Sequence, residues 1–360
     1  MPLRRVALVL GGGGLKGFAH IGVLTALAEH GIVPSLLAGS SIGSLLAAAH
    51  VTGMSTDEMA RRASTLQRRD LFRMNHVEVL MSRMKARSIY LEEPLRALVE
   101  SVIPDVGFQD LTAPLLVNTV DIVHGTQVVW GMPGLRDVSV RDAVYASCAL
   151  PFAFPPGRVD GRVCVDGGTV DNLPVRAAGV NVDAIIAVDV GNADLPPAHD
   201  IMAQGFANIY LRAASTMMHA LQQYPLEHWD GPPMLLVRPK IAHIDWFGFA
   251  HTPELIAAGY RATMDALAQA EDWLSAPGGI YPRRAVQVEV DRDKCVGCGL
   301  CVSLAPKLMG LDSTGKAFAR TRYVDWSPAD GDFVGQCPTL AISATDKGAL
   351  ATPLRTASGR

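Results

Sequence analysis

Ser41 stands at the centre of a G-x-S-x-G pentapeptide, Gly39-Ser40-Ser41-Ile42-Gly43. Glycines at these two positions let a strand turn sharply into a helix, because backbone and side chains come close together there. Such a turn projects the serine hydroxyl above the sheet, and the N-terminus of the following helix places a positive dipole end beside it. Ser41 is therefore a candidate nucleophile, and the alternative is a strand-to-helix turn without chemistry.

A second glycine-rich segment, at 12–17 (GGGLKG), directly follows an apolar run. A glycine run after a strand can direct several backbone N–H groups towards one point, which suits either a phosphate or an oxyanion. The segment also fits the dinucleotide pattern G-x-G-x-x-G, which requires an acidic residue at the end of the second strand. Here the second predicted strand leads into Ser41, and the nearby acid, Glu29, ends the first predicted helix. Dinucleotide binding is therefore the weaker interpretation.

A base for a serine nucleophile is harder to find in this sequence. Asp166 follows the apolar segment 163–165 and precedes two glycines, so its carboxylate can point into a cleft with little steric cover. Taken alone, this triplet is more simply interpreted as a turn. Most of the ten histidines lack motif context, and His20 falls on the apolar face of a predicted helix, where we expect a core residue.

Four cysteines near the C-terminus form the strongest pattern, Cys295-x2-Cys298-x2-Cys301 with a remote Cys337-Pro338. Three thiolates within seven residues wrap a compact loop around one cluster, and the remote cysteine completes four ligands. Zinc sites more often use two separated C-x2-C pairs, so we favour an iron–sulfur cluster over zinc or free thiols. Four cysteines indicate [4Fe–4S], which becomes [3Fe–4S] if one iron is lost.

The elements around these residues alternate between strands and helices. Apolar runs at 5–10 and 34–38 predict strands, and each is followed by a glycine turn and a helix, at 18–30 and 42–50. This alternation is typical of a doubly wound α/β fold. Cys148 and Cys164 lie in predicted core segments and are interpreted as buried structural thiols. Further strands are predicted at 115–123, 127–130, 163–165 and 184–190, and a further helix at 252–274.

Composition sets the domain organisation and excludes some partners. Of the 360 residues, 49% are hydrophobic and 19% charged, which excludes disorder and predicts a large core. A net charge of −3 lacks the basic footprint of a nucleic-acid-binding protein. Proline, glycine and serine gather at 275–284, as in a linker. We predict domains at 1–275 and 286–345, a linker at 276–285 and a flexible tail at 346–360.

The sequence also bears on location. No apolar stretch approaches the roughly 18–20 residues of a membrane span, and the run after the first arginines is too short for a signal peptide, so we expect a cytoplasmic protein. Residues 68–87 carry six Lys or Arg against two acids, and with the aromatic segment 246–249 they suit a transient, peripheral contact with an anionic membrane surface. We favour the alternative, a helix packed on the sheet with a solvated basic face and a buried aromatic loop.

Four segments resemble the patatin-like phospholipase family, in order, across 5–190: GGGGLKGFAHIGVL, GSSIGSLLAA, ASCALPFAFPP and VDGGTVDNLPV. The resemblance implies a three-layer α/β/α domain with a mostly parallel sheet, lipid acyl esters as substrates, and a Ser41–Asp166 dyad without histidine. A carboxylate is a poor base in water, so we expect burial to raise the pKa of Asp166. The resemblance also implies an oxyanion hole at Gly12, Gly13 and Gly14, to which we add the N–H of Ile42. Supporting motif positions are Lys16, Gly17, Gly39, Gly43, Gly167 and Gly168.

Residues 286–344 resemble the single-cluster bacterial-type ferredoxins. This implies a small α+β domain with one [4Fe–4S] cluster on the four cysteines Cys295, Cys298, Cys301 and Cys337. Together the resemblances imply a lipid acyl hydrolase, a serine carboxylic ester hydrolase of phospholipase or lysophospholipase type working through an acyl-enzyme. Its appended domain would have a structural, regulatory or electron-transfer role, the last with a redox partner. The alternatives are an electron-transfer protein whose α/β domain docks or binds lipid, and a lipid-binding regulator without turnover.

Overall fold

The structure is a computed structural model that describes residues 4–74, 88–191, 200–246 and 248–346. It divides into two compact units, the first made of 1–222 and 231–278, the second of 223–230 and 279–360. Residues 223–230 group with the second unit, although the sequence places them inside the first predicted domain. Residues 75–87 of the basic segment 68–87, Phe247 and the tail from 347 lie outside the described residues.

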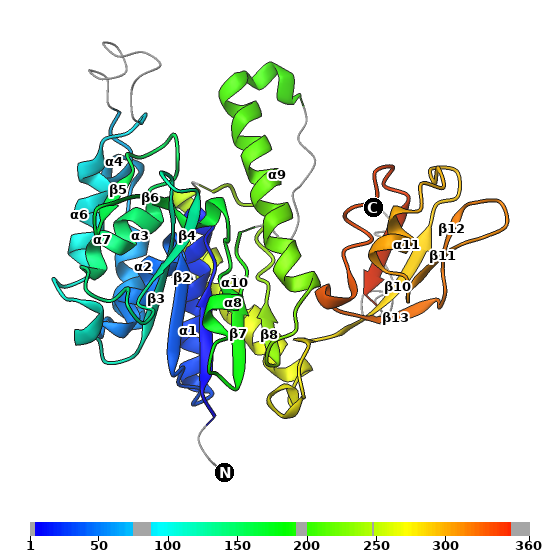
Figure 1. Ribbon diagram of the computed structural model, residues 1–360, viewed down its shortest axis with the longest axis horizontal. Helices are drawn as coiled ribbons and strands as arrows, with labels where there is room; N and C mark the ends of the chain where they lie inside the picture. The colour runs from blue at the N-terminus through cyan, green and yellow to red at the C-terminus, as the bar shows by residue number, and fades with distance from the viewer. Residues whose placement is uncertain (1–3, 75–87, 192–199, 247, 347–360) are drawn as a thin grey trace, which may run out of the picture. The chain divides into compact units, whose positions relative to one another are not determined.

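The first unit is built on a mostly parallel sheet (Figure 1). Short apolar strands buried on both faces form it, as five of five residues are buried in both β1 and β7. Its strands run in the order β5-β6-β3-β2-β1-β7-β8, with β4 paired to β3. The bounds are β1 (Val6–Leu10), β2 (Leu36–Ser40), β3 (Leu115–Asp121), β4 (Thr126–Trp130), β5 (Gly157–Val159), β6 (Arg162–Asp166), β7 (Ala184–Val188) and β8 (Met234–Val237).

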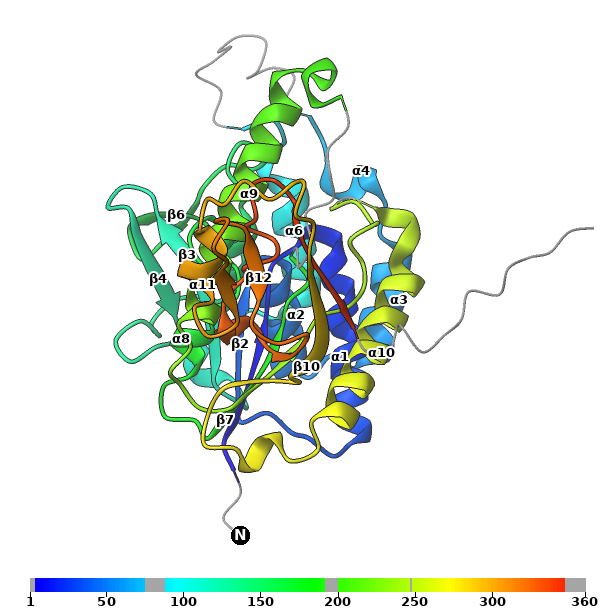
Figure 2. The ribbon, with the colours of Figure 1, turned by 90° about the vertical axis from the view of Figure 1, so that its right-hand side faces the viewer.

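Helices lie on both sides of this sheet, which confirms the three-layer α/β/α architecture (Figures 1 and 2). Two of them, α1 and α10, pack against each other, and α2 packs on β2. Within the described residues, none of the helices combines the length and apolar character that crossing a bilayer demands. The bounds are α1 (Ala19–Glu29), α2 (Ile42–Val51), α3 (Thr56–Thr65), α4 (Arg68–Leu71), α6 (Glu92–Val102), α7 (Val140–Cys148), α8 (Val175–Ala178), α9 (Phe206–Glu227) and α10 (Thr252–Gln269).

The predicted elements are present, and several of them differ at their ends, as the predicted strands at 115–123 and 184–190 end at Asp121 and Val188. The second strand was predicted at 34–38, but β2 extends to Ser40, so that the turn consists of Ser41 alone. The sequence predicts that the last helix ends at about 274, but α10 ends at Gln269. If α10 continued to 274, Glu271 and Asp272 would lie at the negative end of the helix dipole, where acidic side chains are unfavourable.

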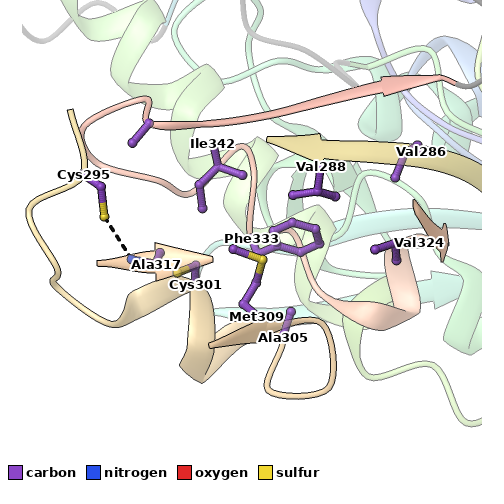
Figure 3. Close-up of a cluster of buried hydrophobic side chains, with 11 residues drawn as sticks. Val286, Val288, Cys295, Cys301, Ala305, Met309, Ala317, Val324, Phe333 and Ile342 are labelled. Carbon is purple, nitrogen blue, oxygen red and sulfur yellow. Dashed lines mark hydrogen bonds between the residues drawn. The ribbon is translucent and has the colours of Figure 1, made fainter. Parts of the chain in front are cut away.

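The second unit is small and rich in strands, as predicted. An antiparallel sheet has the order β13-β10-β14, and β11 pairs with β12. Its core gathers around Phe333, which is 1% exposed, and includes Cys295 and Cys301 (Figure 3). The Glu227 carboxylate accepts hydrogen bonds from Asp332 N at 3.2 Å and Gln336 Nε2 at 3.1 Å. The bounds are β9 (Ile280–Tyr281), β10 (Arg284–Val290), α11 (Leu300–Leu304), β11 (Met309–Leu311), β12 (Ala317–Ala319), β13 (Tyr323–Trp326) and β14 (Ile342–Asp346).

Candidate active site and cluster site

Strand register brings Ser41 and Asp166 together. Ser40, the last residue of β2, pairs with Asn118 of β3, and the next residue of β3, Thr119, pairs with Asp166 at the end of β6. The backbones of Ser41 and Asp166 therefore lie at the same level on either side of β3, two strand spacings or about 10 Å apart. Their side chains meet across this distance, where the Ser41 hydroxyl interacts with the Asp166 carboxylate. Both side chains line the same cavity.

The pentapeptide at 39–43 forms a strained turn. Ser41 has φ 53° and ψ −130°, a backbone conformation that L side chains rarely adopt. A Cβ on Gly43 would collide with the carbonyl of Leu10, and a Cβ on Gly39 would meet the backbone of Gly43. The two glycines are therefore required because β1, β2 and the first turn of α2 approach closely around Ser41.

A buried hydroxyl that the sequence analysis missed holds this turn in place. The N–H of Ser41 donates to Ser147 Oγ at 2.9 Å, and the Ser147 hydroxyl in turn donates to the carbonyl of Asn118 at 2.7 Å. Both Ser147 and Asn118 are fully buried. Ser147 lies in the segment ASCALPFAFPP, so the only signal for it was the family resemblance of that segment.

Asp166 has the electrostatics of a base that works near neutral pH. It is 3% exposed, and burial raises its pKa to about 6, although the Ser41 hydroxyl and the N–H of Gly168 both favour the charged form. The Gly168 N–H donates to Asp166 Oδ1 at 2.8 Å. A general base is most effective when its pKa lies near the working pH, so burial adapts this carboxylate to accept a proton.

Histidine is absent from the cavity wall among the described residues. His20 is fully buried, and its Nε2 lies 2.8 Å from the carbonyl oxygen of Gly11. Burial lowers the pKa of His20 to about 4, and because a carbonyl can only accept, the neutral ring must carry its proton on Nε2. His20 therefore supports the start of the glycine loop from the core.

The glycine loop offers fewer free donors than the sequence suggested. The N–H of Gly12, a predicted oxyanion donor, already donates to the carbonyl of Asn172 at 3.1 Å. It therefore supports the loop and is not available to an oxyanion. In the part of the chain that the structure describes, the N–H groups of Gly13, Gly14 and Ile42 make no hydrogen bond. All three residues line the cavity beside Ser41.

Asn172 is the second residue that the sequence analysis missed. Its Nδ2 donates to the carbonyl of Gly12 at 2.9 Å and to Gln222 Oε1 of α9 at 3.2 Å. A Cβ on Gly12 or Gly168 would crowd its Oδ1, so Asn172 fills the space between the two glycine segments. The residues after Asp166 therefore fasten the glycine loop.

The other motif positions surround the turn. Lys16 is 4% exposed, and burial lowers the pKa of its ammonium group while Asp245 opposes that change. A Cβ on Gly17 would collide with the side chain of Ile42, and one on Gly167 would collide with Asn118. These residues allow close packing at the turn and are not placed to react.

The cavity itself is apolar, with a volume of about 1130 Å³ including its open side. Ser41, Asp166 and the glycine loop line the cavity, and α2, α3 and α6 supply much of the rest of its wall, which is apolar. Arg62 and Asp166 are the charged side chains among the described lining residues. The aromatic segment 246–249, for which a buried loop is the favoured interpretation, contributes Trp246 to this wall. Apolar lining residues include Leu45, Leu46, Ala49, Met59, Leu95, Leu98 and Val102.

Cys148 also lines the cavity, which corrects its interpretation as a purely structural thiol. Burial raises its pKa strongly, and the nearby Asp166 carboxylate raises it further, while a hydrogen bond to Ser44 opposes both effects. Cys164 is fully buried in β6 and fits the prediction for it.

In the second unit, the four predicted ligands line one small cavity together with Pro338. Cys295 and Cys301 are buried, Cys337 is half-buried and Cys298 is exposed. Ala317 N and Ala341 N each donate to a sulfur atom, of Cys295 and Cys337, at 3.4 Å. Hydrogen bonds of this kind stabilise cluster-bound thiolates.

The arrangement of the four thiols also indicates which inorganic group they suit. Four thiols line one small cavity, and backbone N–H groups of Ala317 and Ala341 donate to two of the sulfurs. Each iron of a [4Fe–4S] cluster binds one cysteine, so four thiols around a common space are a donor set that fits such a cluster.

The fold and the two sites define a class of protein. It has an α/β domain with a serine at a strained strand-to-helix turn, and a small domain with four cysteines around one cavity. Residues 8–178 match the sequence model of the patatin-like phospholipases, and residues 288–344 match that of the 4Fe-4S single cluster domain. These two matches, one in each unit, agree with the predicted fusion of a patatin-like phospholipase region and a 4Fe-4S single cluster region.

Curated relatives resemble the first domain. An uncharacterized NTE family protein of Mycobacterium tuberculosis is 37% identical over 197 residues, which are 54% of this chain and 52% of that protein. Patatin-like phospholipase domain-containing protein 6 of Homo sapiens is 34% identical over 194 residues, 52% of this chain and 14% of that protein. The chain thus spans about half or less of these relatives' lengths. Among solved structures, VipD from Legionella pneumophila aligns with a TM-score of 0.40 and 16% identity, covering 77% of this chain and 67% of that chain.

Proposed function

We propose that the first unit hydrolyses carboxylic esters of lipids, with Ser41 as nucleophile and Asp166 as base. The observation that carries this proposal is the pair itself: a serine in a strained turn and a carboxylate whose pKa burial raises to about 6 share one apolar cavity. The apolar wall from α2, α3 and α6 suits an acyl chain.

The mechanism follows from the atoms around Ser41. Asp166 accepts the Ser41 hydroxyl proton as the oxygen attacks the ester carbonyl carbon, and the carbonyl electron pair moves onto its oxygen. The N–H groups of Gly13, Gly14 and Ile42 donate to this oxyanion, and each such donor contributes about 3–4 kcal/mol. Collapse expels the alcohol, which takes the proton from Asp166. Water then attacks the acyl-enzyme in the same way and releases the acid.

We further propose that Cys295, Cys298, Cys301 and Cys337 hold one [4Fe–4S] cluster. Such a cluster supplies one-electron transfer when it is bound, and it organises a small domain that has little other core. Ester hydrolysis moves no electrons, so Ser41 and Asp166 complete the reaction without it. Anaerobically purified protein should contain about four iron and four sulfide per chain, and a stoichiometry of one metal without sulfide would contradict the cluster.

The ester proposal is tested with a chromogenic short-chain ester and a fluorophosphonate probe. The full chain should hydrolyse the ester and be labelled at Ser41. Ser41→Ala and Asp166→Asn should each abolish hydrolysis without unfolding the protein. Ser64→Ala is the matched control, because Ser64 is exposed on α3 and bonds only to a backbone carbonyl of its own helix.

Full turnover in Ser41→Ala or Asp166→Asn would refute the dyad. Absence of hydrolysis and labelling in the unmodified protein, with its iron–sulfur cluster intact, would favour the alternative in which the α/β domain only binds lipid or docks a redox partner.

A further inference from the structure

The exposed face of α9 is apolar, whereas a face turned towards the protein is polar. Met217 is 58% exposed, Leu221 47% and Tyr210 50%, but Gln222 is only 3% exposed. Of the described exposed residues between 209 and 221, all except Thr216 are apolar or aromatic. A surface helix normally has the reverse pattern, with its apolar stripe against the core.

These exposed side chains form a stripe. At 100° per residue, Ile209, Tyr210, Met217 and Leu221 fall within an arc of about 120° on one side of the helix. The N-terminal part of α9 extends past the neighbouring elements of the first unit in both ribbon views (Figures 1 and 2). A contiguous apolar surface of this kind on a soluble domain indicates an interaction site.

The ring of Phe152, a residue with a strained backbone, extends the stripe towards the cavity. Phe152 is 39% exposed with φ 75°, and its ring lies 5.8 Å from that of Tyr210. A bulky side chain in the left-handed region is an outlier whose strain is retained where it serves a function. The loop that presents Phe152 also supplies Leu150 and Phe154 to the cavity wall. We name Phe152, Ile209, Tyr210, Met217 and Leu221 the α9 patch.

We propose that the α9 patch docks on the phospholipid surface that carries the substrate. This inference rests on the proposed lipid esterase function. The patch adjoins the cavity, because Met218, the neighbour of exposed Met217, lines the wall that contains Ser41. Apart from Glu227 at its last position, α9 has no Asp or Glu and carries one arginine, so the part of the helix with the patch does not repel an anionic lipid surface. Tyrosine beside Met, Leu and Phe is typical of side chains at the boundary between headgroups and acyl chains.

Vesicle binding tests this docking surface separately from catalysis. Full-length protein carrying Ser41→Ala, which leaves lipids intact, is sedimented with vesicles of phosphatidylcholine and phosphatidylglycerol. Adding Met217→Gln and Leu221→Gln should weaken the partition coefficient about tenfold or more, since both side chains would leave the apolar phase. The matched control is Val33→Gln with Val180→Gln, two valines that are 83% and 58% exposed away from α9. The control should bind like the parent.

Phe152→Gly provides a second variant, and urea unfolding checks that it folds like the parent. Glycine relieves the positive φ at this position, which offsets part of the stability that is lost with the ring and with the greater freedom of the unfolded chain. The variant should bind vesicles several-fold more weakly, because the ring is lost. In an otherwise unmodified chain, the same substitution should slow hydrolysis of vesicle phospholipid and retain hydrolysis of a soluble short-chain ester.

The outcomes separate the two proposals. Unchanged vesicle binding by both patch variants, or no binding by the parent, overturns the docking surface while soluble-ester hydrolysis stands. A concentration-dependent dimer of the parent that the glutamine substitutions abolish would assign the patch to a second copy of the chain and equally overturn the lipid proposal. Vesicle binding through the patch in a protein that hydrolyses no ester would refute the esterase function and leave the docking surface.

Discussion

Replacing Asp166 by asparagine should stabilise the protein as it abolishes catalysis. Burial raises the pKa of Asp166 from 3.8 to about 6, which means that the folded state binds the proton more tightly than the unfolded chain does. The stability that this carboxyl contributes is therefore fully present below pH 4 and is lost as the pH rises through 6. Above that pH the folded protein carries a desolvated charge that asparagine lacks.

The size of the effect follows from the shift. Two pKa units correspond to about 3 kcal/mol at 1.36 kcal/mol per unit. Between pH 5 and pH 8 the wild-type protein should lose about 1.4 kcal/mol of this relative to Asp166→Asn, because the unfolded carboxyl is already ionised at pH 5. Asparagine retains the acceptor for the N–H of Gly168, so the local hydrogen bond survives the substitution.

Urea unfolding at pH 5 and pH 8 measures this difference, with the fluorescence of Trp130 as a probe because it is fully buried in the first unit. The free energy of unfolding of Asp166→Asn, relative to wild type, should increase between the two pH values. The kcat/KM of the wild type for a soluble ester should rise with pH and level off above an apparent pKa near 6. A difference that is independent of pH, or an activity that falls through pH 6, would refute the desolvated base.

Three further results are expected. Ser147→Ala should lower kcat/KM about tenfold or more, since a buried group left without its partner costs about 1–3 kcal/mol. Ser147→Thr keeps the hydroxyl and should restore part of kcat. Equal KM and kcat in all three proteins would contradict a positioning role. His20→Phe should lose about 1–3 kcal/mol of stability yet keep the pH profile, and a lost pH dependence would instead indicate a hidden histidine base. Cys298→Ala should lose the iron–sulfur absorbance and unfold the second unit first while ester turnover changes less than twofold; a several-fold change would show that the two sites are coupled.

The central sheet could be predicted from the sequence because the patterns that indicate its strands are local in the sequence. Continuous apolar runs define β1, which glycine follows directly, and β7. The two glycines around Ser41 follow from contacts within the turn and with β1. The rise in the pKa of Asp166 was also expected, since a strand end facing an apolar cavity is desolvated.

Long-range contacts could not be predicted in this way. The hydrogen bond from Ser41 N to Ser147 joins residues 106 positions apart, and that from Asn172 to Gly12 spans 160. Such pairs depend on the register of β2, β3 and β6, which a single sequence does not encode locally. The sequence analysis also missed α9, because several of its apolar residues, such as Met217 and Leu221, are exposed and so do not follow the usual pattern of burial.

The placement of Cys148 in the cavity wall has a consequence for chemical selectivity. Two weak acids, a thiol and a carboxylic acid, share one desolvated space, and desolvation raises the pKa of both. The carboxylate becomes a better proton acceptor, but the thiol stays protonated at neutral pH and so is a poor nucleophile. The cavity can therefore contain a sulfur atom beside Asp166 without diverting acyl groups onto it. Reagents that need a thiolate should spare Cys148, and those that need an activated hydroxyl should find Ser41.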